Sequence, residues 1–291
     1  MLLKNKYLKR VKTVLMHRAP GLLIVASRIA GRTVLFKTER RYLAGKSNPR
    51  SDAPSVLFLS YNRCGSMYVS SLLKALTASG HTPIDLGQYA FHGDPSLKPK
   101  LADPTWQETH FRPTGFFFVG FRSPMVFEGL DRFKTLVVLR DPRDVLTSRF
   151  FSVAFAHMPS DAKFVADRKR AQEMGIDAFV LERIEEVRQP YEKFVSEVLG
   201  RPNVLHTRYE DMVTDFEPWL RKVAAHVCPS PDEAVIARLI EESDFKPATE
   251  DKYSHKRSVQ PGSYKTKLKA ETIAKVETAF ADLLPALGYT R

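Results

Sequence analysis

Two segments about seventy residues apart constrain the fold of this 291-residue chain more than any other feature. Each begins as an apolar run, passes through a short polar turn and continues with helical periodicity. The turns are residues 60–66 (SYNRCGS) and residues 139–144 (LRDPRD). A strand that turns into a helix leaves the first N–H groups of that helix without acceptors, and a basic side chain beside them completes an anion site. Two such turns predict a ligand with phosphate-like groups at both ends.

Apolar runs and helical segments alternate along most of the chain. Strands are expected at 56–60, 83–86, 116–121, 135–139 and 204–207, and helices at 67–79, 142–157, within 161–199, at 214–226, 231–243 and 269–284. Residues 87–114 are expected to be mostly loop. Such alternation predicts an α/β fold in which a P-loop-like central parallel sheet is flanked by helices on both faces, followed by a helical C-terminal half. Ligands bind such sheets at the carboxyl ends of the strands.

The positive charge is concentrated at the N-terminus. Residues 1–50 hold 13 Lys and Arg but one acidic residue, whereas residues 51–291 hold 32 basic and 32 acidic residues. Because residues 44–54 have a linker-like composition, we expect a basic amphipathic arm at 1–50 and one α/β domain at 51–291. Apolar positions recur at helical spacing in the arm, which suits a membrane surface that bears anionic lipid. Simple solvation of these charges is the alternative. The arm has few aromatic residues for base stacking, so we expect no nucleic-acid partner.

The cysteine content favours a reducing compartment. Cys64 and Cys228 cannot build a disulfide framework, and neither has a partner at metal-ligand spacing. The apolar run at residues 22–26 is far shorter than a membrane span. We therefore expect a cytoplasmic protein without a metal, in peripheral contact with a membrane if the arm binds one.

The first turn is not a Walker A loop, because Gly65 has neither an upstream glycine at the required spacing nor a following Lys-Ser/Thr. It instead resembles the 5′-phosphosulfate loop of the sulfotransferases. In that resemblance Arg63 takes the basic position and Cys64 the small one, Gly65, Ser66 and Met67 form the turn, and Tyr68 is the aromatic residue that packs on adenine. Met67 replaces the usual Thr or Ser but keeps its backbone donor. Arg in place of the commoner Lys occurs among the Golgi and bacterial members of the family.

The second turn lies in a segment, residues 134–148, that resembles the 3′-phosphate segment of the same family almost residue for residue. Arg140 and Ser148 occupy the positions that bind the 3′-phosphate. An arginine that ends a strand and a hydroxyl two turns into the next helix make a good phosphate clamp. The alternative is a surface turn stabilised by its own ion pairs.

Three further segments follow in family order, and the resemblance spans about residues 55–268. Tyr209 opens a Tyr-Glu-Asp segment that lies near the adenine. Ser243 and Phe245 resemble the segment that frames the base from its other side. Lys256, Arg257 and Ser258 resemble the basic loop over the 3′-phosphate, although Ser258 replaces a glycine and one residue is inserted.

The resemblance implies transfer of a sulfuryl group from 3′-phosphoadenosine 5′-phosphosulfate (PAPS) to an acceptor hydroxyl or amine, without a metal. Arg63 and the backbone donors of the first turn would hold the 5′-phosphosulfate. Arg140, Ser148 and Arg257 would hold the 3′-phosphate.

The general base is the open point of the resemblance. Cytosolic members carry a histidine at the strand end that is occupied here by Arg122. Other branches place the base after the first helix, where His92 and Asp94 fit best. Three further candidates remain, namely His110, Glu128 and His157.

The acceptor is expected to be a small molecule, a lipid or a carbohydrate. One group of phenylalanines either lines an apolar acceptor pocket or fills the core: Phe116, Phe117, Phe118, Phe121, Phe127, Phe150, Phe151 and Phe155. Two rival functions remain: a P-loop nucleoside or nucleotide kinase, and a catalytically inactive relative that only binds nucleotide. The sequence does not indicate the oligomeric state.

Overall fold

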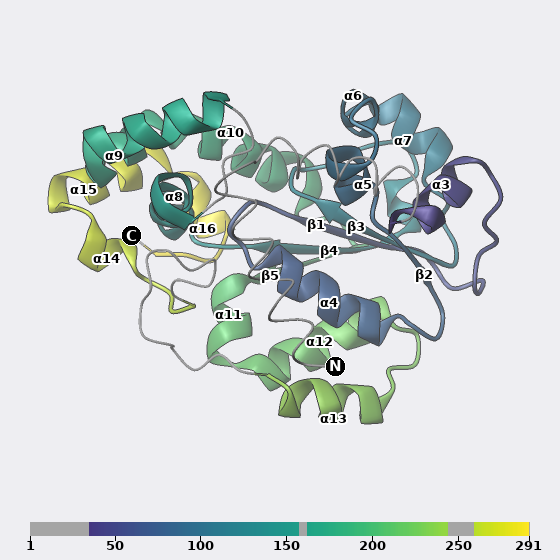
Figure 1. The fold of residues 1–291 in the computed structure, drawn as a ribbon. Coiled ribbons are helices and arrows are strands. Elements are labelled where there is room, and N and C mark those ends of the chain that lie inside the picture. The colour runs from purple at the N-terminus through teal and green to yellow at the C-terminus, as the bar shows by residue number, and fades with distance from the viewer. Residues whose placement is uncertain (1–34, 157–161, 244–258, 291) are drawn as a thin grey trace, which may run out of the picture.

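The computed structural model describes residues 35–156, 162–243 and 259–290 (Figure 1). Its centre is a parallel sheet with the strand order β2-β3-β1-β4-β5. The strands are β1 (Val56–Ser60), β2 (Thr82–Ile84), β3 (Phe116–Phe121), β4 (Lys134–Leu139) and β5 (Val204–Arg208). Each lies within one or two residues of its expected place, because short apolar runs bounded by polar turns are typical of buried parallel strands.

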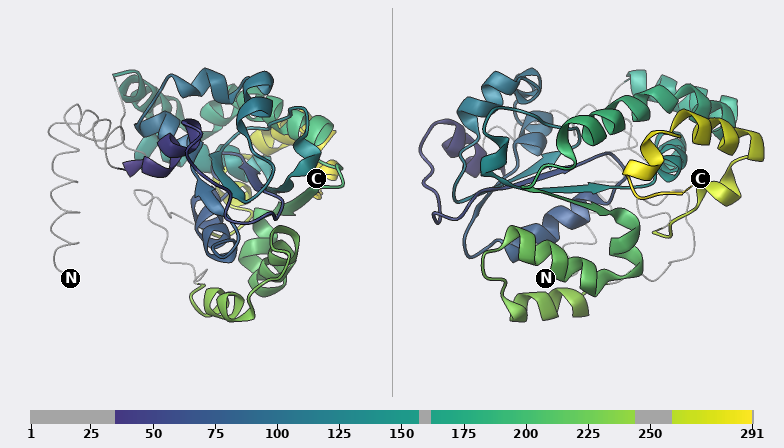
Figure 2. Two further views of the ribbon diagram at one scale, coloured as in Figure 1. Left: turned by 90° about the vertical axis from the view of Figure 1, so that its right-hand side faces the viewer. Right: turned by 180° about the vertical axis from the view of Figure 1, so that it is seen from behind.

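Helices cover both faces of the sheet, as Figures 1 and 2 show. The lower face in Figure 1 carries α4 (Ser66–Leu76), α11 (Tyr209–Thr214), α12 (Phe216–Val227) and α13 (Glu233–Glu241). Over the other face lie α3 (Lys37–Leu43), α5 (Leu86–His92), α6 (Leu97–Leu101), α7 (Pro104–His110), α8 (Pro142–Phe151), α9 (Ala162–Glu182), α10 (Ile184–Lys193), α14 (Tyr264–Lys267), α15 (Ala270–Ala279) and α16 (Leu283–Ala286). Short 3₁₀ or π turns complete the chain at η2 (Leu130–Arg132), η3 (Ser152–Ala156) and η4 (Phe194–Val198). The predicted fold class is confirmed.

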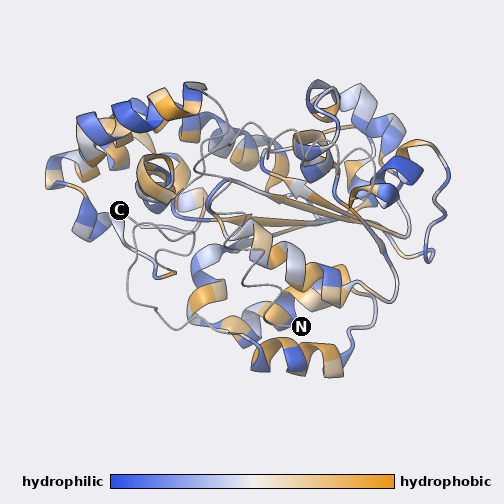
Figure 3. Cartoon of the chain, viewed as in Figure 1, coloured by the Kyte–Doolittle hydropathy of each residue, from blue (hydrophilic) through white to orange (hydrophobic). Residues whose placement is uncertain are grey.

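The core forms two layers because successive strand residues point to opposite faces. In β1, Val56 and Phe58 belong to the cluster under α4 and α12, whereas Leu57 and Leu59 belong to the cluster under α8 and α10. Every residue of β1 is buried. Figure 3 shows the strands as an apolar band between helices that carry both hydrophobic and hydrophilic residues. Most of the phenylalanines that were candidates for an apolar acceptor pocket fill this core instead. Phe116, Phe117 and Phe118 are fully buried.

The expectation of a loop at 87–114 is wrong, since this stretch contains α5, α6 and α7. Two aspartates start helices here: the Asp85 carboxylate accepts from the Gln88 N–H at 3.0 Å, and that of Asp103 from the Thr105 N–H at 3.0 Å. Pro104 occupies the first helical position of α7, which suits proline. Short helices with Pro and Gly between them hide the periodicity on which the prediction depended.

The described part of the expected arm begins at residue 35 and packs on the domain. The Tyr42 side chain of α3 is 2% exposed and its ring meets that of Phe116 at 5.0 Å. The Glu39 carboxylate accepts from the Asp85 N–H at 3.0 Å. Residues 1–34, with the amphipathic pattern, lie outside the described residues, so the boundary at residue 50 stays a prediction. No described helix combines the length and the apolar character that crossing a membrane requires.

Candidate active site

The strand order brings the two turns of the sequence to one edge of the sheet. β1 and β4 are neighbours in parallel register, with Ser60 opposite Val138. The chain therefore leaves both strands at the same carboxyl edge and enters α4 on one side and α8 on the other (Figure 1). In a doubly wound sheet this edge is the usual place for a ligand.

The turn after β1 has an unusual backbone. Arg63 and Gly65 both have φ of 71°, in the left-handed region, and Arg63 is the only described residue other than glycine with positive φ. No side chain caps the N-terminus of α4. Its first N–H groups therefore have no acceptor in the helix and face the turn. A Cβ on Gly65 would lie 3.1 Å from the Tyr209 ring, so this position requires glycine for space as well as for conformation.

The two residues that are expected to bind opposite ends of PAPS contact each other. The Arg63 Nε donates to the Ser148 Oγ at 3.0 Å. Ser148 is 6% exposed and lies in the second turn of α8. This hydrogen bond joins the turn after β1 to the helix after β4.

Arg140 is buried between a carboxylate and an aromatic ring. Its Nη2 lies 3.3 Å from the Asp144 Oδ2, and its guanidinium carbon lies 4.5 Å from the centre of the Tyr209 ring. Burial acts to lower the pKa of Arg140, but the nearby groups, with Asp144 the largest contributor among them, together raise it. The Arg140 Nε is buried and has no hydrogen-bond partner in the described structure. This guanidinium therefore has an unused donor at the carboxyl end of β4.

Asp144 is a hub that the sequence does not reveal. It is fully buried and accepts from the Gly262 N–H at 2.7 Å, the Ser263 Oγ at 3.0 Å and the Tyr264 N–H at 3.1 Å. It thus fastens the segment that follows the predicted basic loop to α8. No local sequence signal indicates these contacts, because the three partners lie 118–120 residues further along the chain.

Arg143, the second arginine of this turn, is already saturated. Its side chain makes a bidentate pair with Asp141, donates to the Glu277 carboxylate at 2.7 Å and to the Thr290 carbonyl at 2.9 Å. Asp141 in turn caps α8 by accepting from the Arg143 N–H at 2.9 Å. The internal ion pair of the alternative interpretation therefore exists, but it uses Arg143 and leaves Arg140 with a donor to spare.

Tyr209 and Glu210 connect the edge of β5 to both turns. The Tyr209 hydroxyl donates to the Val259 carbonyl at 3.0 Å, and burial raises its pKa. Glu210 accepts from the Asp141 N–H at 3.1 Å and from the Tyr289 hydroxyl at 2.6 Å. Burial raises the pKa of Glu210, although these hydrogen bonds oppose the shift. The C-terminal segment 288–290 is thereby held against the carboxyl edge of the sheet.

The other residues that are predicted to bind PAPS differ in their surroundings. Cys64 is buried with its Sγ 3.7 Å from the Tyr191 hydroxyl, and burial raises its thiol pKa to about 11. Met67 is 60% exposed and Tyr68 is half-buried with its ring 6.3 Å from that of Phe216. The Ser243 hydroxyl donates to the Ile240 carbonyl at 2.6 Å. The remaining members of the set lie outside the described residues, namely Phe245, Lys256, Arg257 and Ser258.

The base candidates are also unlike one another. His92 ends α5 with its ring edge-on to that of Phe91. The Asp94 carboxylate accepts from the N–H and the hydroxyl of Ser96, as in a turn. His110 stacks on Trp106 at 4.0 Å. Glu128 is exposed, and His157 lies outside the described residues.

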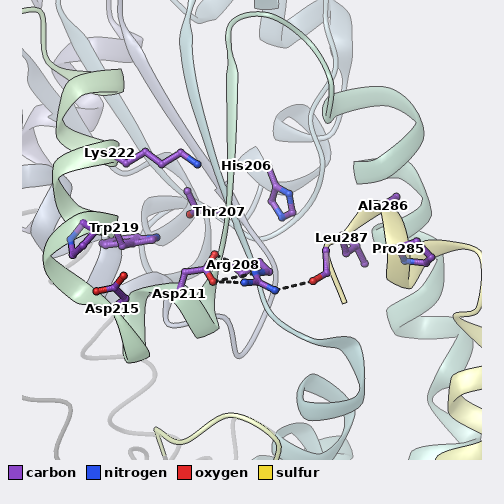
Figure 4. A pocket seen from close by; sticks show the side chains of 12 residues that line it. His206, Thr207, Arg208, Asp211, Asp215, Trp219, Lys222, Pro285, Ala286 and Leu287 are labelled. Carbon is purple, nitrogen blue, oxygen red and sulfur yellow. Dashed lines mark hydrogen bonds and ion pairs between the residues drawn. The ribbon is translucent and has the colours of Figure 1, made fainter. Parts of the chain in front are cut away.

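Two cavities of about 480 Å³ each flank β5, and neither is lined by Arg63 or Arg140. Figure 4 shows the first, where Arg208 reaches from β5 to Asp211 on one side and to the carbonyl of Gly288 on the other. His206 and Thr207 point to opposite sides of β5 (Figure 4). Burial lowers the pKa of His206 to about 4, so its imidazole is neutral at pH 7. The described residues contain no group of three or more His, Cys, Asp or Glu side chains that could hold a metal ion.

Comparison with known proteins gives the same class as the geometry. The family model described as a sulfotransferase domain matches residues 125–287, more than half of the chain. A structure of mouse sulfotransferase SULT7A1 complexed with PAP has a TM-score of 0.50 at 14% identity, covering 84% of this chain and 89% of that one. Retinol dehydratase in complex with retinol and PAP has a TM-score of 0.47 at 19% identity, covering 84% and 86%. No curated protein sequence matches the chain.

The chain therefore belongs to the sulfotransferase family. It is an enzyme of the class that transfers a sulfuryl group from PAPS, which confirms the family and the activity predicted from the two turns. A kinase with the same strand–turn–helix elements is not supported by this match.

Proposed function

We propose that the carboxyl edge between β1 and β4 is the PAPS site. Arg63 and the first N–H groups of α4 hold the 5′-phosphosulfate, and Arg140 and Ser148 hold the 3′-phosphate together with Lys256, Arg257 and Ser258. The observation that carries this proposal is the buried Arg140 guanidinium, whose Nε lacks a partner in the described structure while Asp144 and Tyr209 fix its plane. A buried arginine with a free donor is suited to a doubly charged phosphate.

The adenine lies beside Tyr209 in this proposal. Tyr68, Ser243 and Phe245 complete its surroundings, and Cys64, Gly65, Ser66 and Met67 supply the backbone of the turn. The Tyr209 ring already packs beside Gly65 and under Arg140, and these contacts support its proposed position beside the adenine.

In the proposed reaction the protein positions the donor and stabilises charge. PAPS supplies an activated sulfuryl group. As the bond from sulfur to the bridging oxygen breaks, negative charge grows on that oxygen, and the Arg63 guanidinium and the N–H groups of α4 lie where they stabilise it. Positioning and electrostatics supply most of the catalysis in the related phosphoryl transfers, so we expect no metal requirement.

The acceptor is proposed to be the hydroxyl or amine of a small molecule, with a lipid or a carbohydrate as the class to test first. The structures that resemble this fold include retinol dehydratase in complex with retinol and with androsterone. Residues 1–50 are proposed as an arm that holds the enzyme on an anionic membrane from the cytoplasmic side. For the base, His92 and Asp94 are the candidates that the sequence supplies.

Calorimetry in magnesium-free buffer tests the donor site. We expect 3′,5′-adenosine bisphosphate (PAP) to bind the wild type with micromolar affinity and the Arg140→Ala variant at least about 100-fold more weakly, because a buried charge pair is lost. Arg221→Ala, on the exposed surface of α12, is the matched control and should bind as the wild type does. No binding of PAP, or binding only of ATP with magnesium, would contradict the proposal and return the kinase to consideration. PAP binding without sulfate transfer to any acceptor would favour the inactive relative.

A further inference from the structure

A second polar cluster lies on the same edge of the sheet, on the other side of β1. In the order β2-β3-β1 the carboxyl ends of the strands lead to Asp85, to Arg122 and to the turn that contains Arg63. Neighbouring strands are about 4.8 Å apart, so Asp85 follows a strand roughly 10 Å from β1. Arg122 follows the strand between them. Burial lowers the pKa of Arg122, and the nearby Asp85 carboxylate opposes this shift.

The packing of two glycines brings the Asp85 carboxylate over the end of β3. A Cβ on Gly120 would lie 2.2 Å from the Asp85 Oδ1, and a Cβ on Gly87 would lie 2.4 Å from the Gly120 carbonyl oxygen. Gly120 has φ of 96°, which only glycine adopts readily. Both positions therefore require glycine, because a larger residue would not fit where the Asp85 carboxylate meets β3.

The carboxylate has a fixed orientation and an open side. Its Oδ1 accepts from the Gln88 N–H, which holds it at the N-terminus of α5, and its Oδ2 lies 3.9 Å from the Lys74 Nζ. The Asp85 side chain is 17% exposed, so solvent or a substrate reaches it. The Arg122 Nε is buried without a partner in the described structure.

We infer that Asp85 is the general base of the reaction, positioned beside Arg122, which stands where cytosolic relatives carry their histidine. This inference rests on the proposed donor site. The acceptor hydroxyl gives its proton to the Asp85 carboxylate while its oxygen forms the new bond to sulfur. The bond from sulfur to the phosphate oxygen breaks, and its electron pair leaves on PAP. Atoms and charge balance without a further reactant, and the protonated Asp85 later releases its proton to water.

The charges around Asp85 suit this role. Burial raises the pKa of Asp85, and Glu39 of α3 adds to the increase. The Gln88 N–H, Lys74 of α4 and Arg122 oppose it. A base works best when its pKa is close to the working pH, and a raised carboxyl pKa moves toward it. Asp94, by comparison, already spends its carboxylate on the turn at Ser96.

The test compares Asp85→Asn with His92→Gln and Asp94→Asn. Asparagine keeps the oxygen that caps α5 but cannot take a proton. We expect kcat for sulfate transfer from ³⁵S-labelled PAPS to 2-naphthol, and for sulfate release to water, to fall about 100-fold or more in Asp85→Asn. PAP affinity should stay within threefold of the wild type. Asp85→Glu should recover part of the rate.

The pH profile separates a base from a structural residue. Activity needs ionised Asp85, so the wild-type rate should fall as pH drops through its raised pKa, and Asp85→Asn should lack this acidic limb. A kcat within threefold of the wild type in Asp85→Asn, or a His92→Gln or Asp94→Asn variant that alone loses the rate, would overturn the inference. Loss of PAP binding in Asp85→Asn would show a structural role instead.

If the wild type turns over neither acceptor, a ¹³C NMR titration of the Asp85 carboxyl decides. A pKa at or below the ordinary value of an aspartate contradicts the inference, and a pKa above that value supports it. Absence of PAP binding in the wild type would defeat the donor site itself.

Discussion

The turn after β1 and the turn after β4 begin at adjacent strand ends, yet they are built in different ways. After β4, the residues Arg140, Asp141, Arg143 and Asp144 are all at most 6% exposed and are joined to three distant parts of the chain. After β1, Arg63 is half-buried, its backbone is in the left-handed region, and no side chain caps the following helix. The difference suggests a division of labour. In the proposed PAPS site, Arg140, Asp141, Arg143 and Asp144 would form a preformed clamp for the 3′-phosphate, and Arg63, facing the reacting sulfate, would keep access to solvent and acceptor.

Asp144→Asn should have the largest effect, since it removes the charge at the centre of the clamp. Arg140 would be left buried without its carboxylate, which costs about 3–5 kcal/mol in comparable pairs. We expect this loss in the free energy of unfolding, measured with urea, together with weaker PAP binding. The control is Asp211→Asn, in an exposed pair with Arg208, where the loss should stay below about 1 kcal/mol. Equal losses in the two variants would show that the clamp is no more rigid than the surface.

Arg63→Ala should separate catalysis from stability. If Arg63 stabilises the leaving oxygen, kcat should fall about 10²–10³-fold, as for lost donors in oxyanion sites. The free energy of unfolding should change by less than about 1 kcal/mol, because the side chain is half-buried and makes a hydrogen bond of ordinary strength. Arg63→Lys should keep more activity than Arg63→Ala. A stability loss as large as that of Asp144→Asn would erase the contrast between the turns.

Gly65→Ala probes the space between the two turns. Alanine in the left-handed region costs about 1–2 kcal/mol, and its Cβ would also press on the Tyr209 ring. Gly45 has nearly the same φ, at 72°, but nothing lies within 4 Å of an added Cβ. The melting temperature and PAP affinity of Gly65→Ala should therefore fall further than those of Gly45→Ala. Indistinguishable variants would mean that the contact with Tyr209 is unimportant.

Ser148→Ala should have the smallest effect. It removes the acceptor of the Arg63 hydrogen bond and one ligand of the proposed phosphate site, and a hydrogen bond to a charged group contributes about 1.5–3 kcal/mol. PAP affinity should fall roughly tenfold with little change in melting temperature. Ser71→Ala, on the exposed side of α4, should change neither quantity. An unaltered PAP affinity in Ser148→Ala would place the 3′-phosphate elsewhere.

The sequence predicted the sheet well and the connections less well. Strands such as β1 and β3 are apolar on both faces, so their pattern is local and survives without knowledge of the fold. Helices α5 to α7 were missed because each is short and is stabilised by tertiary contacts, such as that of the Phe36 ring with Tyr89 at 5.4 Å. Their apolar residues become a core only when α3 is in place.

In the site, the residues of the two turns were found from their own motifs. Asp144 was missed as a hub because its partners lie 118–120 residues further along the chain. Asp85 was missed because, in sequence, it is one aspartate before a short helix. Its distinguishing properties are its partial burial and its position beside Arg122, and both arise only when β2 and β3 are paired.

The attachment of Asp144 to residues 262–264 has a consequence for the order of events during synthesis. Because β5 ends at Arg208, all five strands leave the ribosome before residues 262–264 do, so the sheet can assemble while the C-terminal part is still emerging. The Asp144 contacts cannot form at that stage, because Gly262, Ser263 and Tyr264 have not yet emerged, and Arg143 still lacks Thr290. A nascent chain therefore passes through a period in which its sheet can form while the contacts of Asp144 and Arg143 at the proposed PAPS site are still missing.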